Sequence, residues 1–221
     1  MQKKIKGLVL VLVAVLIVSV GLYKFLSTDS AATVNIEKPK VVSQIPLIGN
    51  MAASHSFSSG PVDAKVTVVE FFDPECETCA AVAPYIEKEM DYYKGKVRWV
   101  FRYMTYHKNS ATAVKVLEAA RKQNLFLEAQ HILFTNQKVW GEKQESTETE
   151  ILKVVSQIPK INMAKIKADM NDPSTNDIVA KDAAEGAQGG VTGTPTFFVN
   201  GMILEQLDLD LLIKKINEGL L

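Results

Sequence analysis

The chain has 221 residues, of which 47% are hydrophobic and 23% are charged, so it is long enough for one sizeable domain and too apolar to be disordered throughout. Its 25 basic residues balance 25 acidic ones, and no Lys/Arg-rich stretch follows the extreme N-terminus, which argues against nucleic acid as a partner. The sequence contains only two cysteines, and this number excludes a disulfide-rich scaffold and a four-cysteine metal site.

The N-terminal segment has the pattern of an export sequence. Three lysines precede an apolar run over residues 7–23, which is typical of a secretion signal. Residues 1–26 are expected to be a signal peptide or, as we favour, an uncleaved membrane anchor, because Phe25 and Leu26 extend the run to a spanning length of about 20 residues. The lysines would then face the cytoplasm. The rest of the chain is predicted to lie on the periplasmic side of an inner membrane, where disulfides persist.

Residues 27–60 are expected to be a linker. They mix Ser, Thr, Asn, Gly and Pro and show no sustained hydrophobic period. A short apolar piece around residues 45–51 leaves open whether this segment packs on the domain or drives dimerisation, so the oligomeric state is not predicted. The folded domain is expected over residues 61–221.

A strand–helix–strand unit opens this domain. Residues 66–72 are rich in β-branched and aromatic side chains and predict a buried strand. A helical pattern runs from Cys76 to about Tyr93, and Pro84 is expected to kink it. Residues 97–103 alternate as a second strand.

A helical block is predicted over residues 110–188. Thr147 and Glu150 are expected to form a capping box, and Asp172 is expected to cap a helix that has Pro173 in its first turn.

The C-terminal segment predicts a hairpin followed by a helix. Residues 196–199 read as a strand, Asn200 and Gly201 as a tight turn, and residues 202–204 as the partner strand. Apolar residues from Leu209 onward then share one helical face. The resulting order, β-α-β, a helical block and β-β-α, predicts an α/β fold.

Cys76 and Cys79 form a Cys-x-x-Cys pair that follows a buried strand and opens a helix, an arrangement typical of redox sites. A helix N-terminus presents free N–H groups and a partial positive charge, so the pKa of Cys76 should fall and Cys76 should be the attacking sulfur. Cys79, one turn further, is placed to form the disulfide and release a bound substrate. A structural disulfide, a zinc site completed by histidines and a pair of inert thiols remain alternatives. We expect no cofactor.

Pro195 precedes a predicted strand, where its missing N–H removes a ladder hydrogen bond. An edge position or a cis Thr194–Pro195 bond would explain such a proline. The cis form would expose the backbone of Thr194 for pairing with an extended peptide.

Together these features resemble the DsbA-like branch of the thioredoxin superfamily. The motifs that carry the resemblance are the strand 68–72, the Cys76-Glu77-Thr78-Cys79 motif, Pro84 and the segment Gly193-Thr194-Pro195-Thr196. The resemblance covers roughly residues 60–221. It implies an α/β thioredoxin-like fold with a helical insertion, about residues 105–190, between the second and third strands.

The resemblance also implies an extracytoplasmic dithiol oxidase, isomerase or reductase. Cys76 would be the nucleophile, Cys79 the resolving thiol and Pro195 a cis-proline that faces them. The residues expected to bind substrate lie between the cysteines or before the proline: Glu77, Thr78 and Thr194. The implied partners are proteins that carry thiols or disulfides and a membrane redox protein.

Glu70 is an acid within an otherwise apolar strand, ahead of Cys76. A buried carboxyl resists ionisation, so its pKa should rise toward neutrality, and it would then suit a proton acceptor for Cys79. The family carries an acidic residue at the matching place. A solvated or paired strand position is the alternative.

The residues around the cysteines depart from the strongly oxidising family members, which place a histidine beside the first cysteine. Here Asp73, Glu75 and Glu77 surround Cys76, and like-charge repulsion should oppose its thiolate. This favours a weaker oxidant, unless the three acids form only a solvated rim. His107 is expected to be a surface loop residue.

We therefore expect a thiol–disulfide oxidoreductase that forms disulfide bonds in proteins. A reductase or isomerase of protein disulfides is the alternative within the same chemistry. Two other classes remain: a peptide-binding thioredoxin-fold module without enzymatic activity, and a metallochaperone that holds Cu(I) between the two thiolates.

Overall fold

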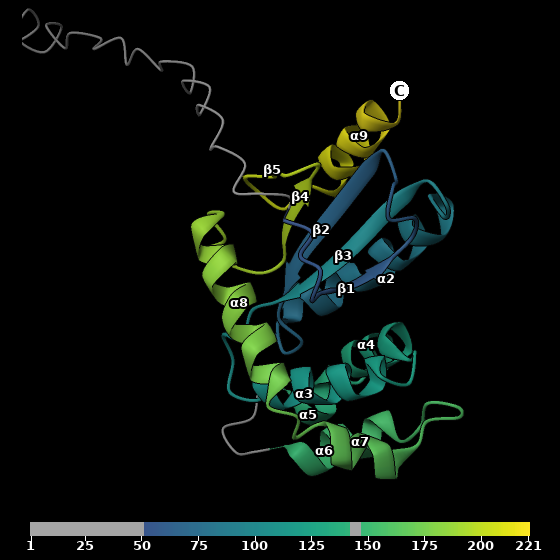
Figure 1. Cartoon of the computed structure of the whole chain (residues 1–221), viewed down its shortest axis with the longest axis vertical. Coiled ribbons are helices and arrows are strands. Elements are labelled where there is room, and N and C mark those ends of the chain that lie inside the picture. The colour runs from purple at the N-terminus through teal and green to yellow at the C-terminus, as the bar shows by residue number, and fades with distance from the viewer. Residues whose placement is uncertain (1–50, 142–146) are drawn as a thin grey trace, which may run out of the picture. The chain divides into compact units, whose positions relative to one another are not determined.

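The structure, a computed structural model, describes residues 51–141 and 147–221 (Figure 1). The expected anchor over residues 1–26 and most of the expected linker lie outside these ranges. Within them, no helix is both long enough and apolar enough to cross a membrane.

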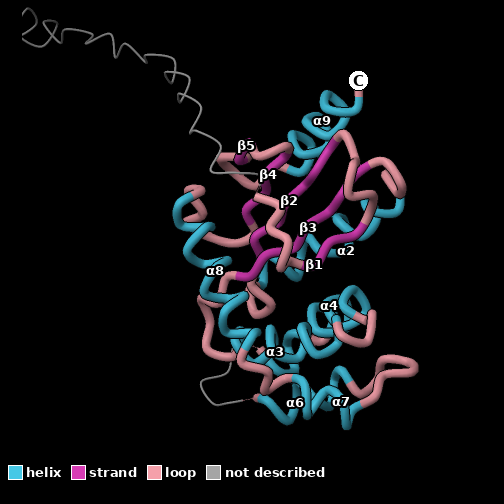
Figure 2. The backbone as a smooth tube through the Cα atoms, viewed as in Figure 1, coloured by secondary structure: helices cyan, strands magenta, loops and turns pink. Residues whose placement is uncertain are grey.

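A mixed five-stranded sheet forms the centre of the domain (Figure 2). The middle strand, β2 (Val66–Phe72), pairs in parallel with β3 (Val97–Tyr103) and antiparallel with β4 (Thr196–Val199). Two short strands, β1 (Phe57–Ser59) and β5 (Met202–Ile203), form the edges, which gives the order β1-β3-β2-β4-β5. The expected strands over residues 66–72, 97–103 and 196–199 are confirmed.

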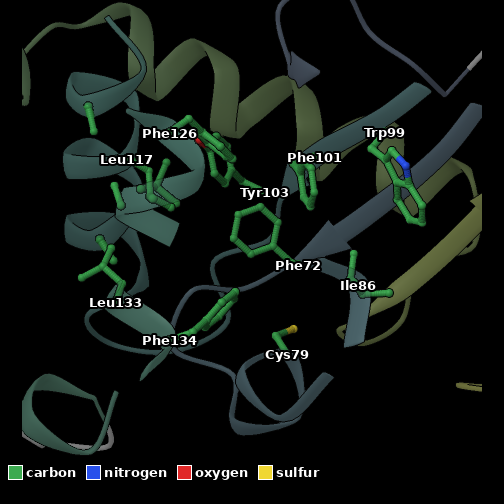
Figure 3. Close-up of a cluster of buried hydrophobic side chains, with 14 of the residues drawn as sticks. Phe72, Cys79, Ile86, Trp99, Phe101, Tyr103, Leu117, Phe126, Leu133 and Phe134 are labelled. Atoms are coloured by element: carbon green, nitrogen blue, oxygen red, sulfur yellow. The ribbon is translucent and has the colours of Figure 1, made fainter. Parts of the chain in front are cut away.

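The alternation of side chains along β2 divides the core between the two faces of the sheet. Val68 and Phe72 belong to a large buried cluster that includes Cys79 (Figure 3). Val69 and Phe71 point to the other face and belong to a smaller cluster. Because both faces are buried, the strand reads as a nearly continuous apolar run.

Helices cover each face. α2 (Glu77–Tyr92) and α9 (Leu209–Leu220) place Ile86 and Leu212 in the large cluster. α8 (Ser174–Gln188) lies on the opposite face, where a methyl group added at Gly186 would come within 2.9 Å of the Phe71 ring. Glycine therefore allows α8 to approach the sheet closely.

The predicted helical block is confirmed, and it lies between β3 and β4. Besides α8 it contains α3 (Ser110–Arg121), α4 (Phe126–Thr135), α5 (Gln137–Trp140), α6 (Glu148–Val155) and α7 (Met163–Asp169). Ala113, Val114 and Leu117 of α3 are fully buried in the large cluster. The block and the sheet therefore share one core, as the expected thioredoxin-like fold with a helical insertion requires.

The segment expected to be a linker ends earlier than residue 60. Phe57 lies in β1, pairs with Phe101 of β3 and stacks on Phe126 of α4 with ring centroids 4.0 Å apart. Met51 is also buried. A strand of three residues is too short to show a period of two. Its partners lie far along the chain, so the local pattern did not reveal it.

The expected capping box at the start of α6 is wrong. The Thr147 hydroxyl caps no N–H group of the helix and instead donates to the carbonyl oxygen of Trp140 at 2.6 Å. Pro173 rather than Asp172 is the N-cap residue of α8, although the Asp172 carboxylate still accepts from the N–H group of Ser174 at 2.9 Å. The Asn200–Gly201 turn is also confirmed, with positive φ angles of 49° and 80°, which type I′ turns require.

Candidate active site

The two cysteines occupy the N-terminus of α2, directly after β2. Cys76 is the N-cap residue of the helix, and its N–H group donates to the carbonyl oxygen of Asp73 at 3.0 Å. Both cysteines are free thiols. Cys76 is 8% exposed, whereas Cys79 is 0% exposed. Only Cys76 therefore offers its sulfur to a partner.

Their surroundings shift the pKa values of the two thiols in opposite directions. The pKa of Cys76 falls from 9.0 to about 5, chiefly because the Cys79 thiol donates to its thiolate. Burial opposes this fall, but the Thr194 side chain and the N–H groups of Cys79 and Thr78 add further donors. The pKa of Cys79 rises well above its usual value, mainly through burial and then through its bond to Cys76 and the charge of Glu70. At neutral pH Cys76 is thus the thiolate and Cys79 the thiol.

The segment before β4 faces the Cys76 sulfur. The Thr194–Pro195 peptide bond is cis, and the Cys76 thiol donates to the Thr194 carbonyl oxygen at 3.4 Å. β5 pairs with β4 only at Phe198 and Val199, so the edge position that was expected for the proline and the cis bond are both present. Pro195 is buried and Thr194 half-buried. Residues from two distant segments, 76–79 and 194–195, therefore meet in one site.

The other expected substrate-binding residues, Glu77 and Thr78, are both exposed on the first turn of α2. They lie between the two cysteines in the sequence and are open to solvent.

Glu70 lies on the same face of β2 as Val68 and Phe72, and it is 5% exposed. Its pKa rises from 4.5 to about 8, first through burial and then through the charge of the Cys76 thiolate. The expected burial and rise in pKa are confirmed, and the alternative of a solvated position is wrong. Near neutral pH this carboxyl holds its proton close to the redox pair.

Two of the three acids that were expected to oppose the thiolate are buried and hydrogen-bonded. Asp73 is 0% exposed, and its carboxylate accepts from the Ser110 hydroxyl and from backbone N–H groups of Tyr106 and Glu75. Glu75 accepts from the N–H group and the side-chain amide of Asn109 at 2.6 and 3.0 Å. The solvated rim is therefore wrong for these two acids, and the pKa of Cys76 is lowered in spite of all three.

His107 is exposed in the loop after β3, as expected, and its ring reaches the segment that precedes Cys76. Its Nδ1 lies 2.8 Å from Asp73 Oδ2, although Asp73 precedes it by 34 positions. Parallel pairing of β2 and β3 places Phe72 beside Tyr103, so the segments after both strands meet at one edge of the sheet. That topology was the signal available in the sequence, since a β-α-β unit places its strands in parallel.

The described residues contain no group of three or more His, Cys, Asp or Glu side chains arranged to hold a metal ion. The two cysteines interact instead with each other and with Thr194.

Comparison with known proteins identifies relatives of this domain. A thioredoxin family model matches residues 52–218. A probable disulfide bond formation protein D of Bacillus anthracis is 31% identical over 180 residues, which cover 76% of this chain and 80% of that protein. The crystal structure of oxidised BdbD from Bacillus subtilis has a TM-score of 0.65 and 26% identity, and the match covers 74% of this chain and 91% of that one.

Some relatives are much longer proteins. A Na(+)/H(+) antiporter NhaA of Herminiimonas arsenicoxydans is 30% identical over 142 residues, which are 64% of this chain but only 22% of the antiporter. The chain thus spans about a fifth of the length of such relatives.

Proposed function

The chain belongs to the DsbA-like thiol–disulfide oxidoreductases of the thioredoxin superfamily, and from this premise we propose that it oxidises pairs of thiols in extracytoplasmic proteins. The observation that carries the proposal is the pKa of Cys76, lowered to about 5. A stabilised thiolate favours the reduced form of the enzyme, which makes the disulfide a stronger oxidant. This favours disulfide formation over the weaker oxidant that the three acids suggested.

The reaction begins with the Cys76–Cys79 disulfide. A substrate thiolate attacks Cys76 Sγ and forms a mixed disulfide, while the bond between the two enzyme sulfurs breaks and Cys79 leaves with its electron pair. A second substrate thiolate then attacks the substrate sulfur of the mixed disulfide, and Cys76 leaves as a thiolate. Two electrons pass from the substrate, whose cysteines become a disulfide, to the enzyme. Cys76 is the better leaving group because its pKa is the lower.

Glu70 is proposed to handle the proton of Cys79. The departing Cys79 sulfur is buried and strongly prefers the protonated form. A neutral Glu70 carboxyl can give it a proton, and a Glu70 carboxylate can take the proton back when the disulfide is restored. The pKa of about 8 makes both directions possible near neutral pH.

Thr194, Pro195, Glu77 and Thr78 are proposed to bind the substrate. The Thr194 backbone lies beside Cys76, where an extended peptide can pair with it as an added strand. The exposed side chains of Glu77 and Thr78 would line the approach.

The location and the partners of the protein are also proposed. Three lysines and an apolar run in residues 1–26 support an anchor that holds the domain on the periplasmic side of the inner membrane. A membrane redox protein would reoxidise the two thiols there. The segment from residue 27 to about residue 50 would connect the anchor to the domain.

Trapping the mixed disulfide tests the proposal. The full-length Cys79→Ala protein, mixed with a protein that carries a disulfide, should accumulate a covalent complex: the Cys76 thiolate attacks the substrate disulfide, one substrate sulfur leaves as a thiolate, and no Cys79 remains to release the other from Cys76. The matched Cys76→Ala protein should form none, because Cys79 is inaccessible. The complex is read by non-reducing electrophoresis, and reductant should dissolve it.

The direction of electron flow is tested by equilibrating the full-length protein with glutathione. A reduction potential of about −120 mV supports a disulfide donor, and a value of about −270 mV identifies a reductase. A wild-type protein that exchanges no disulfide, or a Cys76→Ser protein that keeps the cellular phenotype, would contradict the enzymatic proposal and favour a binding module.

A further inference from the structure

A side chain from the helical insertion holds the backbone on both sides of Cys76. Gln137 is the first residue of α5, and it is buried. Its side-chain Nε2 donates to the carbonyl oxygen of Pro74 at 3.0 Å and to that of Cys76 at 3.1 Å. An NH₂ group carries two hydrogens, so one amide can serve both oxygens. Gln137 therefore bridges the turn that presents the Cys76 sulfur, although it follows Cys76 by 61 positions.

The hydrogen bonds from Gln137 add a remote contact to the local bonds of the Cys76 backbone. The Cys76 N–H group donates to the Asp73 carbonyl oxygen at 3.0 Å. The Cys76 carbonyl oxygen accepts the first hydrogen bond of α2 from the Ala80 N–H group at 3.1 Å. Both of these partners lie within four positions of Cys76. Only a contact with another segment can fix where the turn lies in the domain, and Gln137 provides one.

Packing fixes the place of the Gln137 side chain. Gly141 donates its N–H group to the Gln137 carbonyl oxygen at 2.6 Å. A methyl group added at Gly141 would come within 3.1 Å of Gln137 Cγ and 3.5 Å of Glu75 Cγ. Glycine at this position thus leaves room for the Gln137 stem beside Glu75. The buried Trp140 donates from Nε1 to the Leu133 carbonyl oxygen at 2.9 Å, which attaches the end of α5 to α4.

The reactivity of the Cys76 sulfur depends on its place at the N-terminus of α2. The thiolate accepts from the Cys79 thiol, from the Thr194 side chain and from the N–H groups of Cys79 and Thr78. The thiol form reaches the Thr194 carbonyl oxygen at 3.4 Å. Hydrogen bonds weaken steeply when donor and acceptor are misaligned. A contact that fixes the Cys76 backbone therefore also fixes the donors that its sulfur meets.

We propose that Gln137 positions Cys76 for disulfide exchange by holding the carbonyl oxygens of Pro74 and Cys76. This inference rests on the proposed function, in which Cys76 is the sulfur that is attacked and that leaves. Gln137 acts through the Cys76 backbone and is a positioning residue. The helical insertion thus contributes to the chemistry of the redox pair as well as to the shared core.

The test removes the two donors and keeps the approximate length of the side chain. Methionine is unbranched and flexible, so in full-length Gln137→Met the two carbonyl oxygens lose this partner while the space stays filled. The Cys76 sulfur should then spread over positions in which it accepts fewer hydrogen bonds. Its pKa, followed in the reduced protein by thiolate absorbance against pH, should rise by about 0.5 units, which is a threefold weaker acid. The midpoint of the alkylation rate with iodoacetamide against pH should move by the same amount.

Thr147→Val provides the matched control. The buried Thr147 hydroxyl donates to the Trp140 carbonyl oxygen at 2.6 Å, so this variant also removes a buried hydrogen bond from a side chain to a carbonyl oxygen of the insertion. Losing such a bond costs stability, and both variants should unfold at a lower urea concentration than wild type. In Thr147→Val, however, the pKa of Cys76 should stay within about 0.2 units of wild type.

Gly141→Ala is a second variant that keeps every donor. The added methyl group would displace the Gln137 side chain, so the pKa of Cys76 should rise in the same direction by about 0.3 units, which is a twofold weaker acid. If Gln137→Met does not fold, this variant decides, and an unchanged pKa of Cys76 in it would contradict the inference.

Two further results would overturn the inference. One is a folded Gln137→Met protein whose Cys76 pKa stays within about 0.2 units of wild type, and the other is an equal rise of that pKa in Thr147→Val. The second result would show that any loosening of the insertion has the same effect. Thiolate titration needs no disulfide exchange, so a protein that titrates as expected but never exchanges would contradict only the proposed function.

Discussion

Glu70 and Asp73 are both buried carboxyl groups beside the redox pair, separated only by Phe71 and Phe72, yet their environments differ. Asp73 lies in the loop after β2 and accepts hydrogen bonds from several donors in the segment 106–110 and from Glu75. Glu70 lies within the strand, and among the described residues no donor lies within hydrogen-bond distance of its carboxyl. Burial raises the pKa of Glu70 to about 8.

The difference shows that burial alone does not decide what a carboxyl group does. Desolvation disfavours the charged form, and hydrogen bonds to the charged form oppose that cost. Where the chain brings donors, the acid holds the site together. Where it brings no donor, the acid keeps its proton near neutral pH. Three substitutions test this distinction.

Replacing the hydrogen-bonded acid should cost the most stability. In Asp73→Asn one acceptor oxygen becomes an NH₂ group. Flipping the amide does not help, because Oδ1 accepts from the Glu75 N–H group and Oδ2 from the Tyr106 N–H group. One buried N–H group then faces another donor, and we expect a loss of about 3 kcal/mol in the free energy of unfolding. Urea denaturation at neutral pH measures it.

The exposed Asp63 provides the matched control. Asp63→Asn should change the unfolding free energy by less than about 0.5 kcal/mol. A cost for Asp73→Asn as small as this would contradict the structural role assigned to the buried carboxylate.

Replacing Glu70, the acid that accepts no hydrogen bond, should stabilise the protein at high pH. The folded pKa of Glu70 is about 8, above its ordinary 4.5, so the folded state holds a proton that the unfolded state has released between these values. The stability from this group is fully present below about pH 4.5 and is lost as pH rises toward 8. Because Glu70→Gln stays neutral, its free energy of unfolding should exceed that of the reduced wild-type protein by about 4 kcal/mol at pH 8 and should equal it near pH 4.

Urea denaturation of both reduced proteins across this pH range measures the difference in their free energies of unfolding. Comparison at equal pH largely removes the contribution of Cys76, because both proteins contain it. A difference in unfolding free energy that does not change with pH would contradict the raised pKa of Glu70. The same variant lacks a proton carrier for Cys79, so disulfide exchange should slow by at least about tenfold, which a merely structural residue would not cause.

The exposed acid of the motif should matter least. Glu77 lies on the surface of the first turn of α2, where solvent and salt screen its charge from the Cys76 sulfur. Glu77→Gln should change the glutathione equilibrium constant by less than about twofold. A larger change would restore the like-charge repulsion that the sequence suggested.

Much of this site could be predicted from local sequence. The pair Cys76–Cys79 was identified by its place between a strand and a helix, and the burial of Glu70 by the apolar run around it. Pro195 was noticed because a proline is out of place before a paired strand. Each inference used residues that are neighbours in the chain, where periodicity and backbone chemistry act directly.

Other features required the tertiary structure. Phe57 has its strand partner in β3 and its aromatic partner in α4, so no local pattern marked it as part of the fold. The acids Asp73 and Glu75 looked like a source of repulsion until Asn109 and the neighbouring loop residues supplied donors for them.

The sequence by itself determined the strands, the helix that presents Cys76, and the chemistry of the two thiols, because these depend on nearest neighbours along the chain. The tertiary structure alone decided which charges surround those thiols. His107 meets Asp73 only because two parallel strands end at one edge of the sheet. The electrostatics of a site depend on distances in space, and folding sets those distances by pairing segments that are remote in sequence.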